Sequence, residues 1–171
     1  MKIVDIKITE VSYPMPFTLR WGYLHRDDVG GMVVQVFTDE GVTGIGTVNG
    51  QYVPLRTVLE RTLLPRLKGE NPLDIDRLWN VMYAMSVTTG SEGVAQLFGG
   101  IDIALWDILG KVAGLPIHRL LGTFRDKVPV YIAPSMRQPE AITEEFRKHR
   151  TDGYRAIKVR LGLGFSPRAA S

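Results

Sequence analysis

Residues 99–111 read Gly-Gly-Ile-Asp-Ile-Ala-Leu-Trp-Asp-Ile-Leu-Gly-Lys and lie within the longest helical pattern of the chain. Apolar residues recur there at helical spacing, at Leu97, Ile101, Leu105, Ile108 and Val112. Because side chains three and four residues apart share one helix face, this pattern predicts an amphipathic helix from about Ser91 to Ala113. Gly114 and Pro116 predict its end, since glycine favours the helix C-terminus and proline does not continue a helix.

Two pairs of glycines interrupt otherwise regular patterns. Gly99 and Gly100 lie inside the predicted helix, where each costs about 1 kcal/mol relative to alanine. This cost predicts that another stretch of backbone packs closely against the helix there. Gly44 and Gly46 lie in a predicted strand, and their spacing does not match a dinucleotide-binding fingerprint. We interpret this second pair as a bend in the strand.

The N-terminal region predicts a three-stranded antiparallel meander. Val4, Ile6 and Ile8 alternate with polar residues and predict a strand over residues 3–11. Residues 12–31 contain prolines and glycines together with several aromatic residues, and we predict a long loop there. Two further strands follow, joined by a turn, over the ranges 32–37 and 42–48.

Helices follow this meander. Apolar spacing predicts helices over residues 54–68 and 74–85, the second beginning at Asn71 or Asp74. The predicted fold class is therefore α+β.

A second pattern begins near residue 126. Two short apolar strands over 128–133 and 156–161 flank a polar amphipathic helix over 139–152. Strand, helix and strand in this order predict a βαβ unit with a parallel strand pair. We therefore expect an α+β domain over residues 1–122, a βαβ unit over 126–161 and an irregular tail over 162–171.

Composition and charge exclude several classes of function. The 171-residue chain has no cysteine, so it forms no disulfide framework, thiolate zinc site or iron–sulfur cluster. Its net charge is +3, with 10 basic and 13 acidic residues over 1–118 and 11 and 5 over 119–171. The basic residues of the second region alternate with acidic ones, which favours a solvated helix face over nucleic-acid binding. We expect neither a signal peptide nor a membrane span, and hence a cytoplasmic protein.

Lys158 and Arg160 are the main chemical candidates that the residues themselves offer. Residues two apart in a strand point to the same side, so the two cations lie together. Neighbouring positive charge lowers the pKa of a lysine, which can then act as a base, whereas an arginine stays protonated. An exposed edge strand protected by charges is the alternative interpretation. Asp102 and Asp107 are expected to form helix caps or buried hydrogen bonds rather than a metal site.

Residues 99–111, together with 113–116 and 120–122, closely resemble the mandelate racemase/muconate lactonizing enzyme branch of the enolase superfamily. The predicted turn over 38–41, Gly44-Ile45-Gly46 and the strand opening at Val128 agree with this resemblance in order. It implies an N-terminal α+β capping domain followed by a modified TIM barrel. It also implies a lyase or isomerase in which Mg²⁺ binds a substrate carboxylate, a base removes the α-proton, and the metal stabilises the enolate.

The resemblance also implies roles for individual residues. The family's Lys-x-Lys motif at the end of the second barrel strand falls on Lys158-Val159-Arg160. Arginine at the second position favours acid-sugar dehydration over two-base racemisation. Residues 12–31 and 47–52 match capping-domain loops that close over substrate. Candidate specificity residues there are Trp21, Tyr23, His25, Asn49 and Tyr52, with ordinary loop anchoring as the equal alternative.

The family's carboxylate metal ligands and its His–Asp base lie on later barrel strands. We therefore expect a truncated barrel, no metal ligands in this chain, and a fragment that is inactive by itself. The parent enzyme would act on a small carboxylate or acid sugar as a homo-oligomer. The alternative is a non-catalytic capping module retained for dimerisation.

Overall fold

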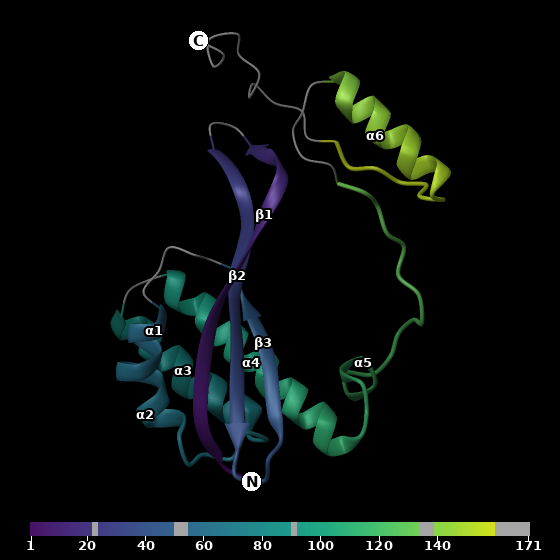
Figure 1. Ribbon diagram of the computed structural model, residues 1–171. Coiled ribbons are helices and arrows are strands. Elements are labelled where there is room, and N and C mark those ends of the chain that lie inside the picture. Colours follow the sequence, from purple (N-terminus) through teal and green to yellow (C-terminus); the bar gives the residue numbers. More distant parts are fainter. Residues whose placement is uncertain (22–23, 50–54, 90–91, 134–138, 160–171) are drawn as a thin grey trace. The chain divides into compact units, whose positions relative to one another are not determined.

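The computed structural model describes residues 1–21, 24–49, 55–89, 92–133 and 139–159 (Figure 1). Three strands form one sheet in the order β1-β2-β3, with the bounds β1 Ile3–Trp21, β2 Leu24–Thr38 and β3 Thr43–Val48. Strands β2 and β3 are antiparallel, and Met32 pairs with Val48. The Thr38 hydroxyl donates to the Val42 carbonyl at 2.7 Å within the connecting turn. The predicted meander is confirmed.

The predicted loop over residues 12–31 is wrong. Strand β1 continues to Trp21 and β2 begins at Leu24, so the two form a long ribbon. The Thr18 hydroxyl donates to Oδ1 of Asp27 across this ribbon at 2.6 Å. Because β1 is an edge strand, prolines at positions 14 and 16 are compatible with it, as they are at sheet edges generally.

The burial pattern of β1 also differs from simple alternation. Ile3, Ile6 and Ile8 are buried, whereas Val4 is 38% exposed, so the buried positions do not follow the alternation of Val4, Ile6 and Ile8 throughout. The step from Ile6 to Ile8 is two residues, as alternation requires, whereas the step from Ile3 to Ile6 is three. The Asp5 carboxylate accepts a hydrogen bond from the Ile6 amide at 2.9 Å within this step.

The helix predicted over 54–68 forms as three consecutive helical segments, α1 Leu55–Val58, η1 Leu59–Leu63 and α2 Leu64–Leu67. The middle segment is a π-helical turn, in which the Leu64 amide donates to the Leu59 carbonyl. Pro65 follows directly. Proline has no amide to donate and its ring clashes with the carbonyl four residues before it, which is a general cause of such irregular turns.

Helices α3, Ile75–Thr89, and α4, Glu92–Ala113, confirm the two longer helical predictions. The Asp74 carbonyl accepts the first helical bond of α3 from Leu78 at 3.0 Å. Helix α4 ends where Gly114 adopts a φ of 66° and the Leu115 amide donates to the Gly110 carbonyl at 3.0 Å. This is the hydrogen-bond pattern of a Schellman motif, and it confirms the end predicted at Gly114.

Helices α1–α4 cover one face of the sheet (Figure 1), and the core lies between them. Its largest fully buried side chains come from both layers and include Ile3, Val34, Leu55, Leu67, Leu78, Met82, Phe98, Ile101, Leu105 and Ile108. The apolar stripe predicted for residues 97–112 therefore faces this core at four of its five positions, whereas Val112 is 46% exposed.

Glycines bring α4 and β3 into backbone contact. A Cβ atom at Gly44 would overlap the Ala104 carbonyl oxygen, and one at Gly46 would overlap that of Gly100. The bend predicted at Gly44 and Gly46 is wrong, because β3 is one continuous strand. The close packing predicted for α4 is confirmed at Gly100, whereas Gly99 faces open space.

The chain divides into two compact units, Met1–Ser12 with Gly30–Phe124 and Tyr13–Val29 with Arg125–Ser171. The first also contains a short helix, α5 Ile117–Leu120. The second contains α6, Pro139–Thr151, and one parallel bridge between Ile132 and Ile157. The Ile132 amide donates to the Ala156 carbonyl at 3.0 Å, and the Lys158 amide donates to the Ile132 carbonyl at 2.8 Å. The predicted parallel pairing is present at this one bridge, whereas the described residues of 128–133 and 156–161 do not form the two strands predicted there.

Replacing Gly46 by alanine tests the backbone contact between α4 and β3. Because a Cβ atom would collide with the Gly100 carbonyl, we expect Gly46→Ala to lower the free energy of unfolding by about 3 kcal/mol. Gly99→Ala is the matched control, because its new methyl group meets open space. This substitution should raise the free energy of unfolding by about 1 kcal/mol. Urea unfolding followed by circular dichroism measures both. Equal effects of the two substitutions would contradict the contact.

Candidate functional site

The two aspartates of the 99–111 stretch have different surroundings. Asp107 accepts hydrogen bonds through Oδ2 from the Ile45 amide at 2.8 Å and from Lys111 Nζ at 2.6 Å. Lys111 also donates to the Thr43 carbonyl at 2.7 Å. Both side chains thus bind the backbone of β3 along its open edge, which confirms the hydrogen-bonding role predicted for Asp107.

Asp102 lies half-buried on α4, toward Asp76 of α3. Burial, and then the negative charge of Asp76, raise the pKa of Asp102 above the ordinary value of 3.8. Its side chain makes no hydrogen bond with any residue that the structure describes, so the cap or buried hydrogen bond expected of it is absent there. In such surroundings the ionised form of a carboxyl group is disfavoured rather than stabilised by a partner.

Lys158 is exposed and follows Ile157 in the extended segment after α6. The side chain of Ile157 lines a hollow beside α6. Because neighbouring side chains in extended backbone point to opposite sides, Lys158 lies on the face away from that helix. Arg160, its predicted companion, lies outside the described residues.

The predicted substrate-binding residues are only partly described. His25 is exposed near the start of β2, and Asn49 is exposed directly after β3. Trp21 ends β1, but its side chain is outside what the structure describes, as are Tyr23 and Tyr52 altogether. Their roles in specificity therefore stay predictions.

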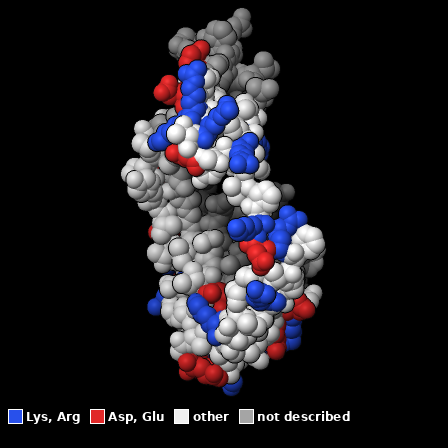
Figure 2. Space-filling view, turned by 90° about the vertical axis from the view of Figure 1, so that its right-hand side faces the viewer, with Lys and Arg blue, Asp and Glu red and all other residues white. Residues whose placement is uncertain are grey.

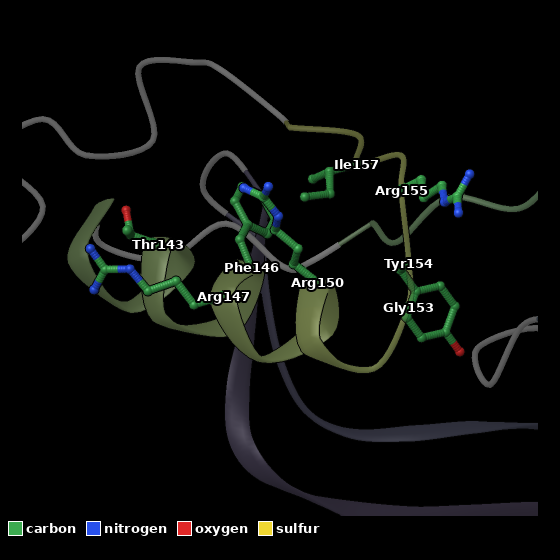
Figure 3. Close-up of a pocket in the computed structure, with 8 residues that line it drawn as sticks. All are labelled: Thr143, Phe146, Arg147, Arg150, Gly153, Tyr154, Arg155 and Ile157. Atoms are coloured by element: carbon green, nitrogen blue, oxygen red, sulfur yellow. The ribbon is translucent and has the colours of Figure 1, made fainter.

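Sequence reasoning missed one feature of the second unit. A hollow of about 800 Å³ is lined by α6 and the residues after it, namely Thr143, Phe146, Arg147, Arg150, Gly153, Tyr154, Arg155 and Ile157 (Figure 3). The spacing of Arg147 and Arg150, three apart on a helix, could have indicated that they share a face. The acidic residues before and after them, Glu144, Glu145 and Asp152, obscured this signal, because they favoured a solvated helix face.

Metal-binding groups matter in this chain because the resemblance implies Mg²⁺. Within residues 1–21, 24–49, 55–89, 92–133 and 139–159, no three His, Asp or Glu side chains come close enough to hold a metal ion. Mg²⁺ is bound in proteins mainly through carboxylate and other oxygen ligands.

Residues 3–122 match the family described as mandelate racemase/muconate lactonizing enzyme, N-terminal domain. The chain belongs to this family. The match includes the three-stranded sheet and the helices through α5, and it confirms the α+β fold predicted for this region.

Two curated relatives illustrate the range of activities in the family. The chain is 36% identical over 135 residues to the D-galactonate dehydratase family member RspA of Halomonas elongata, covering 77% of this chain and 34% of RspA. It is 30% identical over 172 residues to the N-succinyl-L-Arg/Lys racemase of Bacillus cereus, covering 95% of this chain and 45% of the racemase. The chain thus spans between a third and half of the length of these relatives.

Solved structures agree with this assignment. An enolase-superfamily member from Polaromonas sp. JS666 has a TM-score of 0.86 and 31% identity, over 99% of this chain and 46% of that one. A mandelate racemase/muconate lactonizing enzyme structure from Roseovarius nubinhibens, complexed with magnesium, has a TM-score of 0.81 and 27% identity over 99% and 46%. Among the described residues of our chain, no helix is both long and apolar enough to span a bilayer.

Asp102→Asn tests the surroundings of this carboxyl group. Because its pKa is raised in the folded chain, its ionised form opposes folding, and this cost appears as the pH rises above 3.8. We therefore expect Asp102→Asn to raise the free energy of unfolding at pH 7, with the gain disappearing below pH 3.8. Urea unfolding at both pH values measures this.

Asp107→Ala is the matched control for Asp102→Asn. It removes the acceptor for Ile45 and Lys111, so it should lower the free energy of unfolding by about 1–2 kcal/mol at pH 7. A loss of stability at pH 7 in both variants would show that Asp102 has a stabilising partner after all.

Proposed function

We propose that the chain forms the N-terminal part of a magnesium-dependent enzyme that removes the α-proton of a carboxylate substrate. Family membership and the dehydratase and racemase relatives support this reaction class. The relatives' greater length supports the view that this chain supplies only part of such an enzyme. When bound by the complete enzyme, the metal would hold the substrate carboxylate and stabilise the enolate.

What best supports this proposal is the position of Lys158, which directly follows the parallel bridge of Ile157 with Ile132. Alternation in extended backbone would put its side chain on the face away from α6, since Ile157 lines the hollow beside that helix. In a TIM barrel the helices surround the strands, so the face away from the helix points into the barrel. A lysine there can bind a substrate carboxylate as a cation, or accept a proton when its pKa is lowered.

Arg160 follows two residues later and carries a permanent positive charge. It stands where the family's motif has a second lysine, and arginine does not exchange a proton with the substrate at neutral pH. We therefore propose the dehydratase type, acting on an acid sugar, with Arg160 holding or stabilising negative charge. The sequence similarity to the D-galactonate dehydratase family member RspA supports this choice.

The end of the β1–β2 ribbon is the proposed substrate cover. Its residues, Tyr13–Val29, belong to the same compact unit as residues 125–171, which contain Lys158. We propose that Trp21, Tyr23 and His25 contribute to substrate selection from this ribbon. Asn49 and Tyr52 would do so from the segment after β3.

An alternative proposal is a non-catalytic capping module that forms a dimer. A hollow of about 570 Å³ in the first unit supports it, lined by Ile45, Ile103, Trp106, Asp107, Lys111, Ile117 and Leu121. Ile103 and Leu121 are 51% and 64% exposed. Exposed apolar side chains grouped in this way are a common feature of surfaces that bind another protein.

The role of Lys158 can be tested in a chimera in which residues 1–159 replace the matching part of Halomonas elongata RspA. We expect magnesium-dependent turnover of an acid sugar, and a loss of at least about 100-fold in kcat on Lys158→Met. Lys148→Met is the matched control, because Lys148 is exposed on α6. Equal activity of the two variants would contradict a role for Lys158 in the reaction.

The 171-residue chain by itself should neither bind Mg²⁺ measurably by calorimetry nor dehydrate any acid sugar. Turnover by this fragment would contradict the expected inactivity. The capping alternative predicts instead a dimer in sedimentation velocity that Ile103→Asp converts to monomer, since the substitution places a charge in the apolar hollow. A monomer at all concentrations would contradict the alternative.

A further inference from the structure

The hollow beside α6 combines positive charge with aromatic side chains. Its lining includes Arg147 and Arg150 from α6, and Arg155 from the segment that follows. Figure 3 shows the Arg150 side chain beside Phe146, whereas the side chains of Arg147 and Arg155 extend outward at opposite ends of the hollow. Its volume of about 800 Å³ lies within the range of pockets that bind small molecules.

The described residues that line this hollow carry positive charge and no negative charge. None of the eight is acidic. Within the described part of the chain, no hydrogen bond or ion pair involves the guanidinium groups of Arg147, Arg150 and Arg155. The neighbouring acids Glu145 and Asp152 instead lie 3.7 and 3.8 Å from the ring nitrogens of His149. In the space-filling view of Figure 2, Lys and Arg side chains lie in the upper part of the molecule together with Asp and Glu side chains.

Guanidinium groups bind carboxylate and phosphate oxygens through paired N–H donors. A single small anion would meet only one or two of three groups that are spread along a hollow. Several linked anionic groups would engage them together, and the ring of Phe146 offers an apolar contact beside Arg150. The arrangement therefore fits an extended anion better than a compact one.

We propose that this hollow is a binding site for a molecule that carries linked oxyanion groups, either phosphates or carboxylates. The site differs from the proposed catalytic one, because Ile157 lines the hollow whereas Lys158 points to the opposite face. The inference therefore does not depend on the proposed enzymatic activity.

Calorimetric titration of the 171-residue chain at low salt tests this site with tripolyphosphate and citrate as probes. We expect saturable binding of one tripolyphosphate per chain, with orthophosphate binding at least about tenfold more weakly. Binding of tripolyphosphate but not citrate would assign the site to linked phosphates, and the reverse would assign it to carboxylates. Failure of both probes to saturate at millimolar concentration would overturn the proposal.

Substitutions locate the binding. Arg147→Gln/Arg150→Gln should weaken binding at least about tenfold, because each lost charged hydrogen bond costs about that factor. Arg155 lies outside α6. Arg155→Gln should also weaken binding, so the result does not depend on the stability of one helix. Arg61→Gln/Arg119→Gln removes the same charge from exposed positions elsewhere and should leave binding unchanged. An equal loss in this control would show non-specific charge attraction and overturn the site.

Discussion

The backbone of α4 packs directly on β3, and the first compact unit depends on this contact. Glycines at positions 44, 46 and 100 remove the side chains that would hold the helix and strand apart. The close approach lets Ile101, Leu105 and Ile108 reach the core from one helix face. Larger residues would force the two backbones apart, and a dense core tolerates such an expansion poorly.

The same approach brings polar side chains of α4 within reach of the open edge of β3. Asp107 accepts the Ile45 amide, and Lys111 donates to the Thr43 carbonyl. At the other edge of the sheet, the Arg56 side chain donates to the Ile8 carbonyl of β1 at 3.1 Å. These bonds satisfy backbone groups that would otherwise be open to pairing with another strand. The most recognisable stretch of the sequence therefore builds the fold, while the proposed chemistry is assigned to the second unit.

Much of this architecture follows from local patterns. Helix α4 and its end at Gly114, the turn over 38–41 and the parallel bridge of Ile132 with Ile157 all agree with spacing and turn residues. Local patterns did not predict the ribbon of β1 and β2, because prolines predict a loop unless the strand is known to lie at an edge.

The sequence by itself determined the family and the order of helices and strands. These depend on residue types and on the repeat of the backbone, which are local properties. Only the tertiary structure decided why Gly46 and Gly100 are glycines, which partners Asp107 binds, and that Arg147, Arg150 and Arg155 line one hollow. Such contacts join residues far apart in the chain or across a turn, and no local pattern specifies their distances.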